Sequence, residues 1–196
     1  MKSMSELVME VSQTALPDVF LITPRRFGDN RGYFSETWSK RAFEDAGIDL
    51  EFVQDNHSYS AEAGTVRGLH YQSPPSAQDK LVRVGRGAVM DVAVDVRQGS
   101  PTFGQWVAEE LSAANGKQLL VPKGFLHGFA TLCDDVDVFY KCTDFYAPDC
   151  DGGIRFDDPD LAIDWGINPK SAILSDKDAA APGFAQFASP FTYEAA

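Results

Sequence analysis

The sequence has little cysteine and little positive charge, and each shortage argues against particular classes of protein. Its three cysteines, Cys133, Cys142 and Cys150, form an odd set without CxxC spacing. This pattern argues against a disulfide framework and a cysteine metal site, and it favours a reducing cytosol. The 17 Lys and Arg residues are outnumbered by 29 Asp and Glu residues, which gives a formal net charge of −12. A general nucleic-acid binder normally has a basic face, so we expect no nucleic acid as partner.

Long apolar runs are also missing from the chain. No stretch approaches the roughly 20 apolar residues that a membrane-spanning helix needs, so we expect no membrane association. Residues 1–20 are interrupted by Ser, Glu and Gln and do not resemble a signal peptide. Together with the cysteine pattern, these absences lead us to expect a soluble, cytoplasmic protein.

What the chain does contain is typical of a β-rich fold. Hydrophobic residues make up 44% and aromatic residues 12% of the 196 residues, with many Val, Phe and Gly. Short strand-like segments follow one another without alternating helices, which predicts a sandwich or barrel, with a double-sheet jelly roll as a strong candidate. The expected strands cover residues 19–23, 32–38, 52–59, 65–72, 81–85, 88–96, 105–111, 117–121, 127–133 and 136–143.

Some details of the organisation follow from local patterns. The segment 89–96 nearly alternates between polar and apolar residues, which predicts a strand with one buried face. Ser39 and Ser175 are expected to begin two short helices. Two hairpins are expected, one joining 105–111 to 117–121 through an Asn115-Gly116 turn and one joining 127–133 to 136–143. We expect a loosely held N-terminal extension over 1–16, one domain over 17–183 and a C-terminal tail over 184–196.

One of the three histidines lies in a recognisable motif. Gly116, Pro122, Gly124 and His127 follow the spacing of the second cupin motif, in which Thr131 replaces the closing Asn. This resemblance places His127 on a strand that lines the interior of a cupin barrel.

A second histidine, His70, lies in a segment similar to the first half of the first cupin motif. Metal-binding cupins carry another His two residues later and a Glu soon after. Here Gln72 occupies the first of these places, and residues 73–78 contain no carboxylate. A transition metal requires three or four converging donors, so we expect no metal in this site. Catalysis without a metal needs positioned acids and bases, and histidine suits that task near neutral pH.

Further motifs lie in a fixed order along the chain: Phe27–Phe34, Gln54–Ser58, Arg67–Gln72, Pro74-Pro75 with Gln78, Lys80–Arg83, Asp91–Asp95, Pro122–Phe125, His127–Phe129, Tyr140-Lys141 and Leu174–Asp178. Together they resemble the dTDP-4-dehydrorhamnose 3,5-epimerase family of cupins. The resemblance runs from about residue 17 to residue 182 and implies a mainly all-β, cupin-type jelly-roll barrel with a few short helices. The departures are the two terminal extensions and Cys142 and Phe145, where the family often has Thr and Tyr.

The resemblance implies a function as well as a fold. The family epimerises dTDP-4-dehydro-6-deoxy-D-glucose at C3 and C5 to dTDP-4-dehydro-L-rhamnose, by removing and returning protons next to the C4 ketone. The ketone of this dTDP-4-keto-6-deoxy sugar already serves as the electron sink, so no cofactor is expected. The family usually forms homodimers in which strands or arms pair across the interface, and we expect the same here.

Four catalytic roles follow from the resemblance. His70 is the expected base, and Asp178 fixes its tautomer and stabilises the imidazolium that forms. Tyr140 is the expected acid on the opposite face of the sugar. Lys80 is expected to lie against the enolate oxygen as a point charge.

Eight further residues are expected to bind the substrate. Arg67 and Arg31 suit the diphosphate because a guanidinium grips two phosphate oxygens at once. Phe27 and Tyr146 are candidates for stacking on thymine. The full set is Arg67, Asn56, Gln54, His127, Arg31, Phe27, Glu36 and Tyr146, with Asn56 and His127 placed around the sugar.

Each of these residues taken singly has a simpler structural explanation, such as a core tyrosine for Tyr140 or a solvated charge for Lys80. Only the joint match favours an enzyme. Three alternatives stay open: an epimerase that inverts only C3 or only C5, a non-catalytic cupin that binds a sugar nucleotide, and a metal-dependent cupin.

Overall fold

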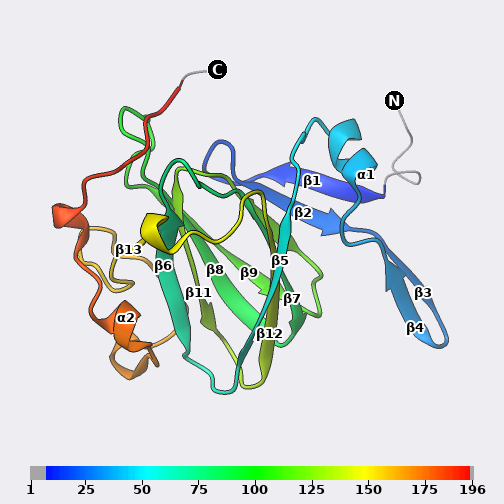
Figure 1. The fold of residues 1–196 in the computed structure, drawn as a ribbon. Helices are drawn as coiled ribbons and strands as arrows, with labels where there is room; N and C mark the ends of the chain where they lie inside the picture. The colour runs from blue at the N-terminus through cyan, green and yellow to red at the C-terminus, as the bar shows by residue number, and fades with distance from the viewer. Residues whose placement is uncertain (1–7, 195–196) are drawn as a thin grey trace.

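Two antiparallel sheets face each other across the core of the computed structural model, which describes residues 8–194 (Figure 1). The six-stranded sheet has the order β1 (Met9–Gln13), β2 (Phe20–Pro24), β10 (Gln118–Val121), β7 (Lys80–Arg86), β12 (Val136–Cys142) and β5 (Gln54–Ser60). The five-stranded sheet has the order β13 (Asp151–Gly153), β6 (Val66–Gln72), β11 (Phe125–Thr131), β8 (Ala88–Asp95) and β9 (Trp106–Ser112). The mainly β, double-sheet fold expected from the sequence is confirmed.

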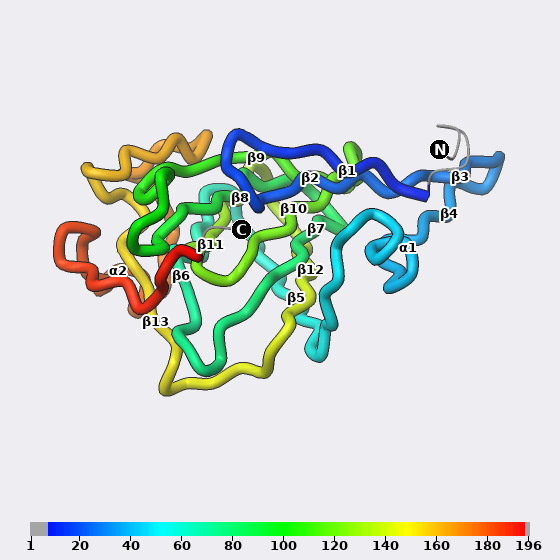
Figure 2. The backbone as a smooth tube through the Cα atoms, turned by 90° about the horizontal axis from the view of Figure 1, so that it is seen from above, coloured from blue at the N-terminus to red at the C-terminus, as the bar shows by residue number. Residues whose placement is uncertain are grey.

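The remaining elements are short. Strands β3 (Arg26–Asp29) and β4 (Gly32–Ser35) form a hairpin that we call the arm, and the helices are α1 (Lys40–Asp45) and α2 (Asp176–Ala179). Figure 2, seen from above, places α1 and the arm at one end of the molecule and α2 at the other. None of the helices in this described part of the chain has the length and the apolar run that crossing a bilayer requires.

The central core lies between the two sheets because successive side chains of a strand point to opposite faces. Val82 and Val138 of the six-stranded sheet share one buried cluster with Val89, Ala93 and Phe129 of the five-stranded sheet. This packing fixes the distance between the sheets, and therefore also the position of the polar side chains that share their inner faces.

The outer faces of both sheets are covered as well. On the five-stranded sheet, Leu126 packs in a second cluster with Trp165 and Phe191 from the C-terminal segments. On the six-stranded sheet, Phe43 of α1 packs in a third cluster with Ile22. The central strands are therefore buried on both sides.

Both predicted hairpins are wrong. Strand β9 pairs with β8, whereas β10 pairs with β2 and β7 in the other sheet, and β11 and β12 likewise belong to different sheets. The Asn115-Gly116 segment does form a tight turn, in which the Asn115 side chain accepts from the backbone N–H groups of Ser112 and Lys117. The turn reverses the chain, but burial of the inner faces places the next strand in the opposite sheet.

The predicted single buried face of residues 89–96 is also wrong. Strand β8 is buried on both faces, and its two carboxylates, Asp91 and Asp95, have no exposed surface. This strand can bury two carboxylates because each has a polar partner: His127 lies 2.9 Å from Asp91, and Arg97 lies 2.7 Å from Asp95.

The ends of the chain are more ordered than the sequence suggests. Residues 9–13 pair with β2, so the expectation of a loosely held extension is wrong there, and residues 1–7 lie outside the described part. In the expected tail, Phe191 is buried, and its carbonyl accepts from the backbone N–H of Gln98. Helix α1 follows Ser39, whose hydroxyl makes no capping bond, whereas Ser175 caps α2 by accepting from the N–H of Asp178.

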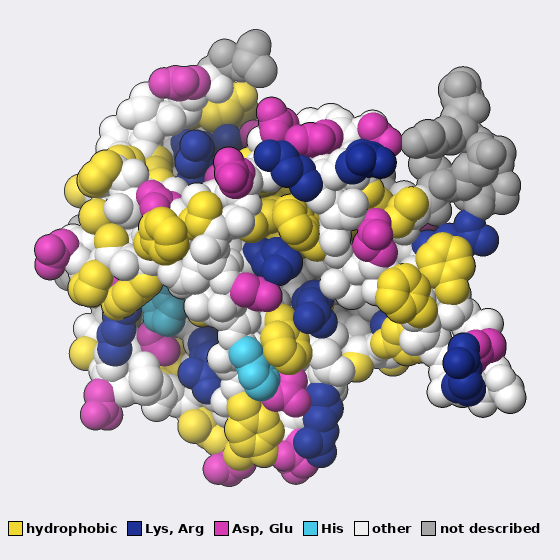
Figure 3. All heavy atoms as spheres, turned by 45° about the vertical axis from the view of Figure 1, so that its right-hand side comes forward, with side chains coloured by type: hydrophobic (Ala, Val, Ile, Leu, Met, Phe, Trp, Pro, Cys, Tyr) yellow, Lys and Arg dark blue, Asp and Glu magenta, His cyan; other side chains and the backbone are white. Residues whose placement is uncertain are grey.

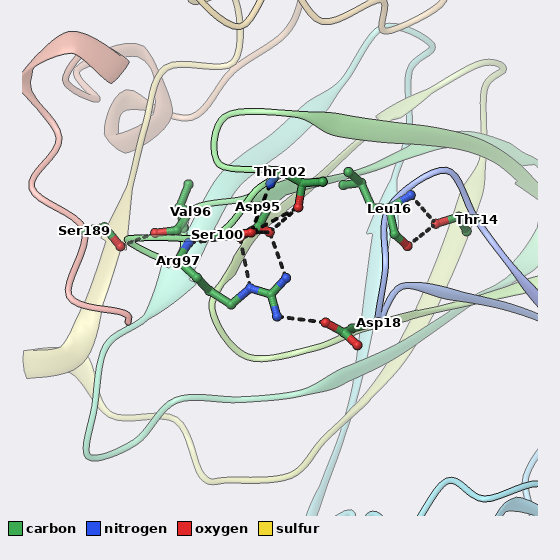
Figure 4. A network of polar contacts seen from close by, with 9 residues as sticks. All are labelled: Thr14, Leu16, Asp18, Asp95, Val96, Arg97, Ser100, Thr102 and Ser189. Atoms are coloured by element: carbon green, nitrogen blue, oxygen red, sulfur yellow. Dashed lines mark hydrogen bonds and ion pairs between the residues drawn. The ribbon is translucent and has the colours of Figure 1, made fainter. Parts of the chain in front are cut away.

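A buried ion pair joins the end of β8 to the N-terminal part of the chain. Arg97 donates to the Asp95 carboxylate through Nε at 3.0 Å and Nη2 at 2.7 Å, and to Asp18 through Nη1 at 2.9 Å (Figure 4). The hydroxyls of Ser100 and Thr102 donate to the same carboxylate, each at 2.6 Å. Burial opposes ionisation of Asp95, but these hydrogen bonds outweigh it and lower the pKa of its carboxyl below 3.8.

We expect Asp95→Asn to lower the free energy of unfolding by about 3 kcal/mol, because Arg97 then keeps a buried charge with incomplete compensation. Urea unfolding followed by tryptophan fluorescence measures this change. The control is Asp157→Asn, which removes an exposed partner of Arg155 and should change stability little. Equal stability of the two variants would contradict the prediction.

Candidate active site

A cavity of about 430 Å³ lies between the inner faces of the two sheets and is closed on one side by the segment that leads into α2. Strands β6 and β11 contribute from one sheet and β5, β7 and β12 from the other. The lining residues are Ser58, Thr65, Val66, Arg67, His70, Lys80, His127, Phe129, Tyr140, Ile173, Leu174, Ser175, Lys177 and Asp178. Six of the twelve predicted site residues therefore meet in one cavity.

His70 and Asp178 form a hydrogen-bonded pair at one wall of this cavity. His70 Nε2 lies 2.5 Å from Asp178 Oδ1, and the carboxylate side chain is only 6% exposed. Burial opposes ionisation of Asp178, but the hydrogen bond and charge of His70, with the Ser175 hydroxyl and Lys177, outweigh it and lower the pKa of Asp178 below 3.8. An ionised Asp178 accepts from Nε2–H, so Nδ1 of a neutral His70 is left to take up a proton.

Lys80 and Tyr140 occupy the facing sheet. In the pairing of β7 with β12, Lys80 lies opposite Cys142 and Tyr140 opposite Val82, so all four side chains share the inner face. Within residues 8–194, neither the Lys80 ammonium nor the Tyr140 hydroxyl makes a hydrogen bond or ion pair. Both head groups are therefore available to a ligand.

Burial shifts the ionisation of both groups. It raises the pKa of the Tyr140 phenol above 10.0; Cys142 adds to this effect and Arg67 opposes it. It lowers the pKa of the Lys80 ammonium below 10.5, although nearby negative charges partly compensate. Tyr140 is therefore a neutral phenol that can donate a proton at neutral pH.

Arg67 and His127 complete the polar wall of the cavity. Arg67 donates from Nε to Ser60 Oγ at 3.2 Å and from Nη2 to the carbonyl of Tyr59 at 2.9 Å, which anchors its guanidinium on β5. His127 lies directly opposite His70 in the pairing of β11 with β6. The two imidazoles thus share one cavity with three basic side chains, those of Arg67, Lys80 and Lys177.

Gln54, Asn56 and Tyr146 lie beside the cavity but are not among the residues that line it. Gln54 donates to Asn56 Oδ1 at 3.0 Å and accepts from the backbone N–H of Tyr146 at 3.1 Å. Asn56 Nδ2 lies 3.6 Å from the Sγ atom of Cys142. Tyr146 is 59% exposed, so its ring can offer a face to a planar ligand at the surface.

The other three predicted ligands are not brought to the cavity within one chain. Phe27 and Arg31 belong to the arm, which projects from the body of the molecule, and Glu36 follows it (Figure 1). The Arg31 side chain is 85% exposed and pairs with Asp29 at 2.5 Å. Hydrophobic side chains are exposed beside the charged tip of the arm (Figure 3). Phe34 of β4 is 70% exposed.

Sequence reasoning missed several polar groups around the cavity. Lys177, which forms an ion pair with Asp151, and Ser58, whose buried hydroxyl has no hydrogen-bond partner, both belong to motifs that the sequence displayed. Asp91, behind His127, is fully buried, whereas the alternating pattern of its strand predicts a single buried face. In residues 8–194 no group of three or more His, Cys, Asp or Glu side chains converges in a way that would hold a metal ion.

Comparison with known proteins identifies the family. The family described as dTDP-4-dehydrorhamnose 3,5-epimerase matches residues 13–186. A relative of that name from Pseudomonas aeruginosa is 52% identical over 178 residues, which covers 90% of this chain and 97% of the relative.

Two solved structures agree with this match. The Bacillus anthracis epimerase, solved with TDP and PPi bound, superposes with a TM-score of 0.87 at 52% identity and covers 90% of this chain and 99% of its own. The Legionella pneumophila epimerase, solved in complex with dTDP-4-keto-L-rhamnose, has a TM-score of 0.90 at 46% identity and covers 95% of this chain and 100% of its own. The chain belongs to the dTDP-4-dehydrorhamnose 3,5-epimerase family.

Proposed function

We propose that this protein converts dTDP-4-dehydro-6-deoxy-D-glucose into dTDP-4-dehydro-L-rhamnose by inverting C3 and C5. The observation that carries the proposal is the meeting of the His70–Asp178 pair, Lys80 and Tyr140 in one cavity of a member of this epimerase family. The L. pneumophila relative holds a sugar nucleotide of this class, which supports the same substrate here.

The chemistry starts at the C4 ketone of the substrate. Removing the proton from C3 or C5 leaves an electron pair that delocalises onto the carbonyl oxygen and forms an enolate. The substrate itself therefore accepts the electrons, and no step needs an oxidant or reductant. The protein has to supply a base, an acid on the opposite face and a stabilising charge at the oxygen.

His70 takes the base role in this proposal. Its Nδ1 atom accepts the proton while the C–H bond breaks, and Asp178 stabilises the resulting imidazolium through Nε2–H. Tyr140 donates its phenol proton to the other face of the same carbon, and Lys80 balances the charge on the enolate oxygen. Both proton carriers then return to their starting states by exchange with water.

The nucleotide part of the substrate is proposed to bind outside the cavity. Arg67 would hold the diphosphate, and Tyr146 would stack on thymine at the surface next to Gln54. Because the predicted ligands Phe27 and Arg31 project on the arm, we propose a homodimer in which each arm completes the partner's site. The three cysteines are free thiols, which is compatible with the cytoplasmic location that we propose.

NMR of the keto-sugar nucleotide in D₂O tests the function directly. We expect deuterium at both C3 and C5 together with formation of the L-rhamno product. Deuterium at a single carbon would instead identify an epimerase that inverts one centre. Binding of the nucleotide without any exchange would identify a non-catalytic cupin, and loss of activity with a chelator would indicate a metal-dependent one.

Lys80→Arg tests the charge at the enolate oxygen through the pH profile. Because burial lowers the pKa of Lys80, the cation should be lost as pH rises toward 10.5, and kcat/KM of the native protein should fall in that range. Burial shifts Tyr140 in the opposite direction, raising its pKa above 10.0. Arginine stays charged throughout, so the alkaline fall should move to higher pH even though the maximal rate decreases. An identical alkaline limb in both proteins would assign the ionisation to another group.

A further inference from the structure

Gln72, which stands where metal-binding cupins carry a second histidine, has no part in the proposed proton transfers. It lies on β6 two residues after His70, so both side chains point to the inner face of their sheet. Gln72 is only 6% exposed and is not among the residues that line the cavity. A buried amide needs hydrogen-bond partners, and the partners of this one indicate its role.

Two of those partners are backbone groups of the loop that carries Tyr146. Gln72 Nε2 donates to the carbonyl of Phe145 at 3.0 Å, and Gln72 Oε1 accepts from the N–H of Ala147 at 2.9 Å. The same Nε2 atom donates to the carbonyl of Ser76 at 2.5 Å. One buried side chain therefore holds both peptide groups that flank Tyr146 and ties them to β6.

Two further glutamines hold the same loop, residues 144–147. Gln78 Nε2 donates to the carbonyl of Asp144 at 2.7 Å, and Gln54 Oε1 accepts from the N–H of Tyr146 at 3.1 Å. Glutamine suits this task because its amide can donate to one peptide group and accept from another. Each residue of the loop thus has a backbone group bound by a glutamine side chain.

The side chains of this loop contrast with its backbone. Phe145 is 63% exposed and Tyr146 is 59% exposed, although the peptide groups around them are tied to the sheets. A surface loop that becomes ordered only on binding loses conformational entropy, which weakens the complex. Here the glutamines order the loop before any ligand arrives, so its aromatic rings are presented at little entropic cost.

We propose that Gln72 is a positioning residue that fixes the loop 144–147 in the conformation in which Tyr146 receives the base of the nucleotide. This inference rests on the proposed function, in which Tyr146 stacks on thymine. Gln72 acts through the loop rather than on the reacting carbon atoms. It should therefore strengthen binding of the substrate and of its transition state equally, and leave the proton transfers unchanged.

Gln72→Met keeps the length of the side chain and removes its amide. We expect KM for the keto-sugar nucleotide and Kd for dTDP each to rise about 10-fold, because the loop then has to be ordered during binding. The value of kcat should stay within about twofold of the native value, as for any loss of uniform binding. A fall in kcat at unchanged KM would place Gln72 in the chemical step and overturn the proposal.

A double-mutant cycle with Tyr146→Ala tests whether Gln72 acts through this ring. Once the ring is absent, adding Gln72→Met should raise Kd for dTDP by less than about twofold, since the two residues contribute to one interaction. Calorimetry with dTDP measures all four corners of the cycle. If the full 10-fold effect persists without the ring, Gln72 acts by another route and the proposal is wrong.

Gln78→Met supplies a second variant, and Gln98→Met supplies the matched control. The first removes the bond to Asp144 and should raise Kd for dTDP about threefold. Gln98 also donates to a backbone carbonyl, that of Ser189, but it lies outside the cavity, so its variant should bind dTDP like the native protein.

The dTDP affinities separate failure of this inference from failure of the proposed function. Native affinity in both Gln72→Met and Gln78→Met would overturn the inference while leaving the proposed function intact. Should Gln72→Met not fold, native affinity in Gln78→Met alone would overturn it. If the native protein itself does not bind dTDP, the proposed function fails and this inference fails with it.

Discussion

Replacing His70 with alanine is expected to lower the rate of solvent-proton exchange at both C3 and C5 by about 10⁴-fold. The cavity has a second imidazole, that of His127, but its Nε2 lies 2.9 Å from Asp91 Oδ1, and the proposed reaction gives it no proton to remove. The substitution also leaves the carboxylate of Asp178 without its partner. In the proposed reaction both proton removals use Nδ1 of His70, so exchange at C3 and C5 should be lost together.

The measurement is deuterium uptake at each carbon, followed by NMR in D₂O over equal times for native and variant proteins. Calorimetry with dTDP should show nearly native affinity, which separates loss of the base from loss of the site. The control is His57→Ala, which removes an exposed histidine on the outer face and should retain full exchange. Exchange near the native rate in His70→Ala would remove this residue from the base role.

The sequence predicts the strands well because alternating apolar and polar residues, and the turn-forming residues between strands, are properties of short segments. It cannot predict which sheet a strand joins, since that depends on which inner faces meet across the core. The turn around Asn115 is an example. The sequence predicts the turn correctly, but β10, the strand after it, pairs with β2 and β7 rather than with β9.

The order of the motifs along the chain predicts the candidate site, whereas the local chemistry of each residue does not. Residues 70 and 178 are far apart in sequence, and only the fold brings them to 2.5 Å. The burial of Asp91 escaped prediction because its hydrogen-bonding partner, His127, lies on another strand. The positions of Phe27 and Arg31 could not be predicted at all, since the path of the arm depends on tertiary structure and, in our proposal, on a second protomer.

Replacing Tyr140 with phenylalanine is expected to separate proton removal from inversion. The ring stays packed against the core cluster, so the cavity should keep its shape, and only the hydroxyl is lost. His70 can still remove a proton and return a deuteron to the same face. Deuterium should therefore enter without change of configuration, while formation of the L-rhamno product falls by about 10³-fold.

The ratio of deuterium uptake to product formation is the quantity that decides this prediction, because it does not depend on how much active protein is present. A second expectation concerns pH. Burial raises the pKa of Tyr140 above 10.0, so this acid stays protonated at neutral pH in the native protein. Raising the pH through neutrality should therefore not abolish inversion while deuterium exchange continues. Tyr59→Phe, which removes an exposed hydroxyl on the outer face, should leave the ratio unchanged. A native rate of inversion in Tyr140→Phe would place the acid elsewhere, and Lys80 would be the next group to test, since it shares the inner face with Tyr140.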